Sequence, residues 1–149
     1  MTISAFAAAK YLAERSDWAL TNLQMQKILY LAHMVYLGQN AGEPLIREAF
    51  EAWDYGPVCP ILYHKLKIYG ADPVGNIFRS YTELEEGSRE AEILKEALDS
   101  LGSLSGGKLV AITHRKGGAW EKNYRNGMKS IIIPNSDIAG EYRERFSGD

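Results

Sequence analysis

Residues 21–38 read TNLQMQKILYLAHMVYLG, and this stretch predicts the helix around which the rest of the chain folds. Thr21 and Gln24 have the spacing of a capping box, which satisfies backbone N–H groups at a helix start, and Leu20 with Met25 forms a hydrophobic staple. The residues that follow are apolar on nearly every side: Met25, Ile28, Leu29, Ala32, Val35 and Tyr36 mark one face, and Leu23, Tyr30, Leu31, Met34 and Leu37 widen it. A helix with so little polar face belongs in the middle of a domain, and Gly38 is expected to end it.

The sequence on both sides of this stretch predicts further helices and a few short strands. The expected helices run from Ser4 to about Glu14, from Pro60 to Tyr69, from Ser88 to Gly102, over residues 106–113 and 120–124, and from Asn135 or Ser136 onward. Short strands are expected within residues 48–53, around Ile77 and over residues 130–133. We therefore expect a mainly helical α+β domain, with about six or seven helices around a central apolar helix and a small two- or three-stranded sheet.

The composition is that of an ordinary globular protein. The 149 residues are 46% hydrophobic and 24% charged, which predicts a single domain spanning residues 1–149. The formal net charge of −2 gives no bulk attraction to nucleic acid or to an anionic membrane. A single cysteine excludes an internal disulfide, and the N-terminus lacks the basic region of a signal peptide. These features predict a soluble cytoplasmic protein with no nucleic-acid or membrane partner.

The residue types that most often carry chemistry are present without the spacing that chemistry requires. His33, His64 and His114 match no zinc-binding pattern, so we expect no metal, and the glycine pairs lack phosphate-binding spacing. His33 is expected to be a satisfied core or interface histidine, His64 to lie at the surface, and His114 to end a helix shortly before Trp120. Cys59 is expected to be a packed thiol. We therefore expect no cofactor and no catalytic residue.

A dense aromatic turn at residues 53–58, WDYGPV, is the most unusual local feature. Glycine opens backbone angles closed to other residues and proline fixes the next φ, so Gly56 and Pro57 make a stiff corner. Trp53 and Tyr55 place two large side chains beside it. Either this corner anchors the core, or it presents aromatic side chains to a binding partner.

The order of these features resembles the Panacea, or SocA-like, antitoxin domain. The resemblance rests on Thr21, Lys27, Leu29 and Tyr30, the string from Glu51 to Pro60 around Trp53-x-Tyr55-Gly56-Pro57-Val58, then Tyr63, Tyr69, Gly70, Leu109, Thr113, His114 and Trp120. It implies a bacterial or phage-encoded component of a toxin–antitoxin system that neutralises a cognate toxin by direct contact. In the best-known type of member, the antitoxin also acts as an adaptor that delivers its toxin to the ClpXP protease through the ClpX unfoldase. It implies neither a cofactor nor catalysis.

For such a protein we expect a partner-binding surface on the aromatic corner. Its candidate residues are Trp53, Tyr55, Gly56, Pro57, Val58 and Tyr63, with His114 and Trp120 packed nearby. The alternative is a small hydrolase or nucleic-acid-modifying enzyme that uses His114 and Asp54, and a homo-oligomeric scaffold is a third possibility. A cleft with strongly shifted titratable groups would favour the enzyme.

Overall fold

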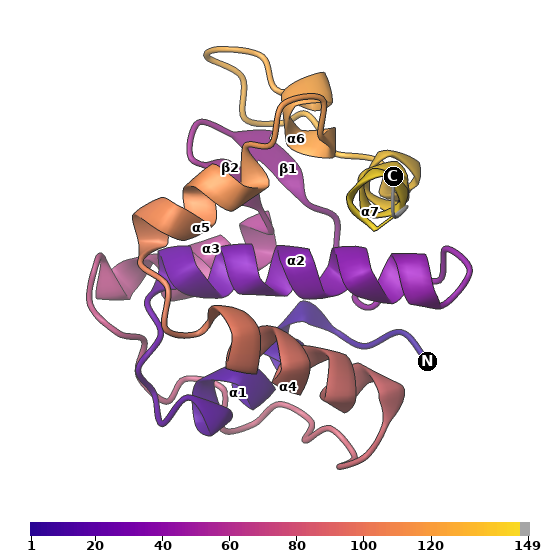
Figure 1. Cartoon of the computed structure of the whole chain (residues 1–149). Coiled ribbons are helices and arrows are strands. Elements are labelled where there is room, and N and C mark those ends of the chain that lie inside the picture. The colour runs from indigo at the N-terminus through magenta and orange to yellow at the C-terminus, as the bar shows by residue number, and fades with distance from the viewer. Residues whose placement is uncertain (147–149) are drawn as a thin grey trace.

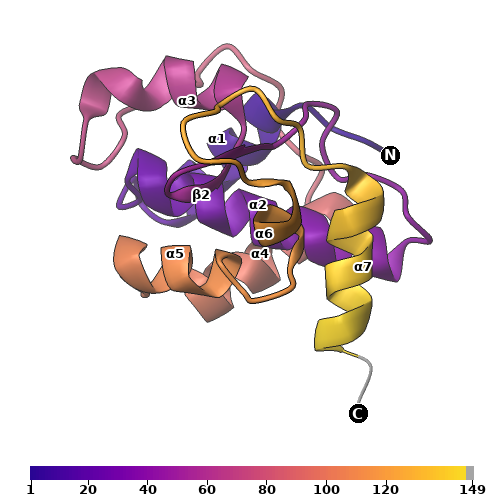
Figure 2. The ribbon, with the colours of Figure 1, turned by 90° about the horizontal axis from the view of Figure 1, so that it is seen from above.

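A computed structural model of the chain describes residues 1–146, and one long helix, α2 (Asn22–Gln39), runs through its middle (Figure 1). The other elements are α1 (Ala5–Arg15), β1 (Glu51–Trp53), β2 (Gly56–Val58), α3 (Pro60–Leu66), a 3-10 turn η1 (Lys67–Tyr69), α4 (Arg89–Leu101), α5 (Gly106–Thr113), α6 (Ala119–Asn123) and α7 (Asn135–Arg145). Helices α1 and α4 cover one side of α2, whereas α3, α5 and the two strands cover the other (Figure 1). Figure 2 shows β2 between α3 and α5, with α7 crossing the far end of α2. The mainly helical α+β prediction is confirmed.

The central helix forms as the sequence predicts at its start and differs at its end. The Thr21 hydroxyl accepts a hydrogen bond from the backbone N–H of Gln24 at 3.2 Å, and the Gln24 side chain accepts one from the backbone of Thr21 at 3.0 Å. Gly38 does not end α2, which continues to Gln39. A Cβ on residue 38 would overlap the Tyr142 ring. Gly38 therefore allows α7 to cross α2 closely, and the prediction that it ends the helix is wrong.

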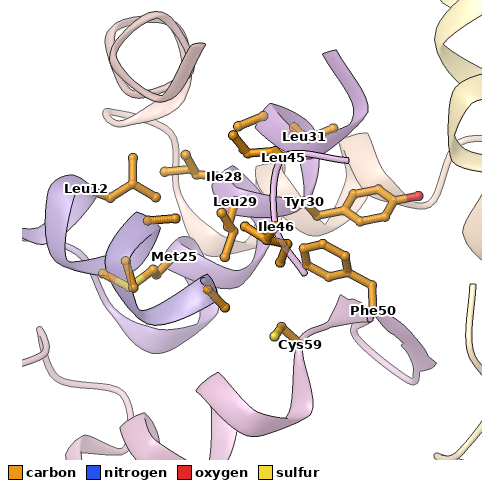
Figure 3. Packing of buried hydrophobic residues seen from close by; sticks show 14 of the residues in the cluster. Leu12, Met25, Ile28, Leu29, Tyr30, Leu31, Leu45, Ile46, Phe50 and Cys59 are labelled. Carbon is orange, nitrogen blue, oxygen red and sulfur yellow. The ribbon is translucent and has the colours of Figure 1, made fainter. Parts of the chain in front are cut away.

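The core forms where α1, α2 and the loop before the sheet meet (Figure 3). Leu12 from α1, most apolar side chains of α2, and Ile46 and Phe50 from the loop are almost fully buried, whereas Leu23 in the first turn of α2 is 38% exposed. The rings of Tyr30 and Phe50 meet edge to face, with centroids 5.2 Å apart. Cys59 is buried beside this cluster, and burial raises the pKa of its thiol to about 11. The packed-thiol prediction for Cys59 is confirmed.

The sheet is at the small end of the expected range. Strands β1 and β2 pair antiparallel, with Glu51 opposite Val58. The strand expected over residues 130–133 is reduced to a single bridge between Ile132 and Glu51, although neighbouring backbone groups on both sides of the bridge are hydrogen-bonded. No strand forms around Ile77, whose N–H bonds back to the carbonyl of Gly75 in a turn.

Most of the other helix boundaries follow local rules. Ser4 and Ser88 cap α1 and α4 with their hydroxyl groups, as predicted. Pro134, and not Asn135 or Ser136, is the N-cap of α7, and the Asn135 side chain instead contacts His33 of α2. In α3 the side chains of Leu62 and Leu66 are buried, whereas that of Ile61 is half exposed.

Candidate functional site

The aromatic corner at residues 53–58 folds as a β-hairpin, with Asp54 and Tyr55 in the turn between the strands. Gly56 has a φ of +106°, which side chains other than glycine rarely adopt. A Cβ there would also lie 2.8 Å from the Thr113 hydroxyl and 3.1 Å from Cε of Lys27. Glycine at position 56 is therefore required both for the turn and for the close packing of the hairpin against α2 and α5.

A pocket of about 350 Å³ opens beside this hairpin. Its lining residues are Asn22, Leu23, Gln26, Lys27, Trp53, Asp54, Tyr55, Val58, Tyr63, Lys67, Gly70 and Lys129. Tyr55 is 73% exposed and Trp53 is partly exposed. The Trp53 ring packs edge-on against Tyr63, with centroids 4.9 Å apart, and its indole N–H donates to Glu51. These contacts hold the Trp53 and Tyr63 rings in place at the pocket, and Tyr55 projects into solvent beside them.

His114 and Trp120 lie behind the hairpin and support it. Their rings stack with centroids 3.7 Å apart and planes only 3° from parallel. The indole N–H of Trp120 donates to the backbone carbonyl of Trp53 at 2.8 Å, which fixes the end of β1. Trp120 itself is only 9% exposed. Of the two tryptophans, Trp120 belongs to the core and Trp53 to the pocket wall.

The predicted site residues therefore fall into two groups. Those that line the pocket are Trp53, Tyr55, Val58 and Tyr63, and those that pack behind it are Gly56, Pro57, His114 and Trp120.

Sequence reasoning did not single out Lys27 as a site residue, although it lies directly under the pocket. Lys27 is fully buried in α2, and its ammonium group donates to the carbonyl of Pro57 at 2.9 Å. Within residues 1–146 no carboxylate forms an ion pair with it, and burial lowers the pKa of Lys27 to about 7. The feature of the sequence that could have identified Lys27 as a site residue is its position within the largely apolar stretch of the central helix.

One polar atom next to Lys27, on His114, also lacks a hydrogen-bond partner among residues 1–146. His114 Nε2 is buried and has no hydrogen-bond partner in the described part of the chain. Burial, and then the positive charge of Lys27, lower the pKa of His114. A Cβ on Gly56 would touch both Lys27 and His114, so the two side chains converge on one point beneath the hairpin.

The enzyme alternative predicts a cleft with shifted titratable groups, and Lys27 and His114 beneath the pocket are such groups, whereas its proposed pair, Asp54 and His114, is not joined by a hydrogen bond in the described chain. Asp54 accepts a hydrogen bond from the Tyr124 hydroxyl at 2.5 Å, and no hydrogen bond or ion pair joins Asp54 to His114 among residues 1–146. His33 is buried, with Nε2 2.9 Å from the Asn135 side-chain oxygen, which confirms the prediction of a satisfied core histidine. His64 is exposed, as predicted.

Comparison with known proteins identifies the family. The model of the family described as "Antitoxin SocA-like, Panacea domain" matches residues 25–121, a segment that contains both the hairpin and Trp120. This chain belongs to the SocA-like Panacea family. This Panacea domain is also similar to Antitoxin SocA of Caulobacter vibrioides (strain NA1000 / CB15N), with 31% identity over 132 residues that cover 80% of this chain and 70% of that protein. No solved structure matches the chain. Among the described residues, none of the helices combines the length and hydropathy that a membrane crossing needs.

Proposed function

We propose that this Panacea domain is an antitoxin that neutralises a cognate toxin by direct contact, and that the toxin docks on the pocket beside the hairpin. Membership of the antitoxin family supports a toxin partner. The position of the toxin-binding site is supported by an accessible aromatic cluster around a pocket of about 350 Å³, made of Trp53, Tyr55 and Tyr63. Buried aromatic side chains are the groups that most often dominate the energy of protein interfaces.

The hairpin is well suited to this role because it is rigid before the partner arrives. Gly56 packs against α2 and α5, and the Trp120 indole holds the carbonyl of Trp53. A surface that is already ordered loses little conformational entropy on binding. Tyr55 can therefore contribute its large exposed area to binding at low cost.

The experiment is co-expression with the protein encoded by the adjacent open reading frame, followed by measurement of growth and of the dissociation constant of the complex. Because Tyr55 is 73% exposed, Tyr55→Ala should fold normally. We expect it to lose growth rescue and to weaken binding by about 30-fold, the equivalent of a hot spot of roughly 2 kcal/mol. Trp53→Ala should act in the same direction.

Phe146→Ala is the matched control, since Phe146 is 60% exposed at the end of α7 beside a different, apolar pocket. It should rescue growth as well as the wild type does. If Phe146→Ala loses rescue while Tyr55→Ala retains it, the binding site lies on α7 and not on the hairpin. If the neighbouring protein is harmless alone and does not co-purify with this chain, the antitoxin proposal fails.

Neutralisation by contact requires a complex and not a reaction, which gives a second test. Toxin activity in vitro should fall in proportion to added Panacea domain and end at a fixed molar ratio. Neutralisation of many toxin molecules by one antitoxin molecule would instead indicate an enzyme.

We further propose, from the family resemblance, that the antitoxin delivers the bound toxin to ClpXP for degradation. In that case the toxin should have a short half-life when the antitoxin is present and a long one in cells without ClpX. A half-life that does not depend on ClpX, with growth rescue intact, would leave sequestration as the mechanism.

A further inference from the structure

We propose that the pocket beside the hairpin receives an acidic side chain, Asp or Glu, of the bound toxin, held by the lysines of the pocket and flanked by its aromatic wall. This inference rests on the proposed function and adds the chemistry that the partner must present.

The charge around the pocket is positive although the whole chain carries a formal net charge of −2. Lys27 lies under the floor, and the exposed Lys67 and Lys129 lie at the rim. Within residues 1–146 none of the three forms an ion pair with a carboxylate. Of the described residues, Asp54 is the one acidic residue that lines the pocket, and it already accepts the hydrogen bond of the Tyr124 hydroxyl. The pocket therefore has more positive charge than its own residues balance.

The two exposed lysines are positioned to contact a ligand directly. The Lys129 ammonium lies 5.3 Å from the centroid of the Trp53 ring, which keeps it over the pocket wall. The Lys67 ammonium is 3.5 Å from Nδ1 of His64 and has no stronger partner in the described chain. A carboxylate that reaches either ammonium group in the pocket would form a charge-assisted hydrogen bond with it.

Lys27 lies beneath the pocket and would attract the carboxylate without touching it. Its ammonium has three donors, and the Pro57 carbonyl takes one of them. Because Lys27 is closed to solvent in the free chain, the charge that it carries when protonated is poorly screened and contributes to the potential in the pocket without direct contact. With a neutral residue at position 27, only the two lysines at the rim would attract the carboxylate.

The aromatic wall restricts what can accompany the carboxylate. Trp53, Tyr55, Tyr63 and Val58 present mainly apolar surface. A free inorganic anion would leave this surface wet, whereas an acidic residue next to an apolar one in a polypeptide would cover it. Aromatic rings together with lysines that lack a carboxylate partner among residues 1–146 therefore favour an acidic segment of a protein partner.

The test measures the dissociation constant between this chain and the protein encoded by the adjacent open reading frame. Lys67→Glu and Lys129→Glu should each weaken binding by about tenfold or more, and Lys27→Met should weaken it by less. Lys95→Glu is the matched control, because Lys95 is exposed on α4 outside the pocket. Its dissociation constant should stay within about twofold of the wild-type value, and wild-type binding should weaken as salt is raised.

A complementary experiment changes the acidic residues of the partner. Single replacement of the partner's acidic side chains by amides should identify one whose loss matches that of Lys67→Glu, and reversing its charge to lysine should restore binding to the Lys67→Glu variant. If deleting the partner's last residue abolishes binding and no acidic side chain matters, the pocket holds a terminal carboxylate and the proposal is wrong.

The two proposals fail in different ways. If the wild-type chain does not bind the neighbouring protein, both are overturned. If the wild type binds and the three lysine variants bind equally well, the toxin-binding function stands and the acidic-residue inference is refuted.

Discussion

Replacing Lys27 by methionine should make the protein more stable while weakening its binding to the proposed toxin partner. Lys27 is fully buried in α2, and burial lowers its pKa from an ordinary value of 10.5 to about 7. Each pKa unit corresponds to about 1.4 kcal/mol, so at pH 7 the buried amine costs roughly 4 kcal/mol relative to a neutral side chain. Methionine has a similar length and carries no charge.

The gain is smaller than that cost because the Pro57 carbonyl loses its hydrogen-bond donor. An unsatisfied buried acceptor costs about 1–3 kcal/mol, which leaves a net stabilisation of roughly 1–3 kcal/mol for Lys27→Met. In a chain of this length, 2 kcal/mol corresponds to a rise in Tm of about 4–8 °C. Urea unfolding of the wild type and the variant at pH 7 measures the difference directly.

The pH dependence makes this prediction specific to the amine. The unfolded chain binds a proton at Lys27 up to a pH near 10.5, and the folded chain only up to a pH near 7. The wild type therefore gains stability relative to Lys27→Met as pH rises from 7 toward 10. A variant that is less stable than the wild type at pH 7, or a difference that is constant across this range, would refute the reasoning.

The remaining predictions concern two glycines and one histidine. Gly56→Ala should lower the free energy of unfolding by roughly 2–4 kcal/mol, because the new Cβ is strained at a φ of +106° and also crowds the residues behind the hairpin. Gly38→Ala should weaken the packing of α7 by roughly 1–3 kcal/mol, because the Cβ would overlap the Tyr142 ring. Burial lowers the pKa of His33, so stability should fall as pH drops below about 6.5, where the unfolded chain takes up the proton first. Chemical unfolding measures all three.

Each of these variants has its own control. Gly42 has a φ of +84° and open space around it, so Gly42→Ala should lower the free energy of unfolding by less than Gly56→Ala does. Equal losses in the two variants would show that packing at residue 56 contributes nothing. Adding Tyr142→Ala to Gly38→Ala should remove most of the clash, so the two effects must not add. In His33→Gln the loss between pH 7 and pH 5 should be smaller than in the wild type. An unchanged loss would assign the acid sensitivity to other groups.

The sequence predicts the central helix well because its signals are local. The capping box at Thr21 and the apolar run of α2 depend only on neighbouring residues, and both form as expected. Gly38 shows the opposite case. Its role depends on Tyr142, about a hundred positions later in the sequence, and no local rule distinguishes a glycine that ends a helix from one that admits another helix.

The difference between local signals and contacts made by distant residues also explains which features of the site the sequence predicted. The WDYGPV string indicates a stiff aromatic turn, and the structure forms a hairpin there. Whether Trp53 or Trp120 faces the core depends on which indole reaches across the fold, and the sequence left that open. The position of Lys27 beneath the hairpin likewise follows only from the packing of β2 on α2.

The hydrogen bond from the Trp120 indole to the carbonyl of Trp53 has a consequence for how such a domain diversifies. It anchors the loop through main-chain atoms, so the scaffold is indifferent to which side chains project from the turn and the rim. An exposed residue of the turn such as Tyr55 can then be exchanged in directed-evolution libraries without altering the main-chain contact that holds the hairpin.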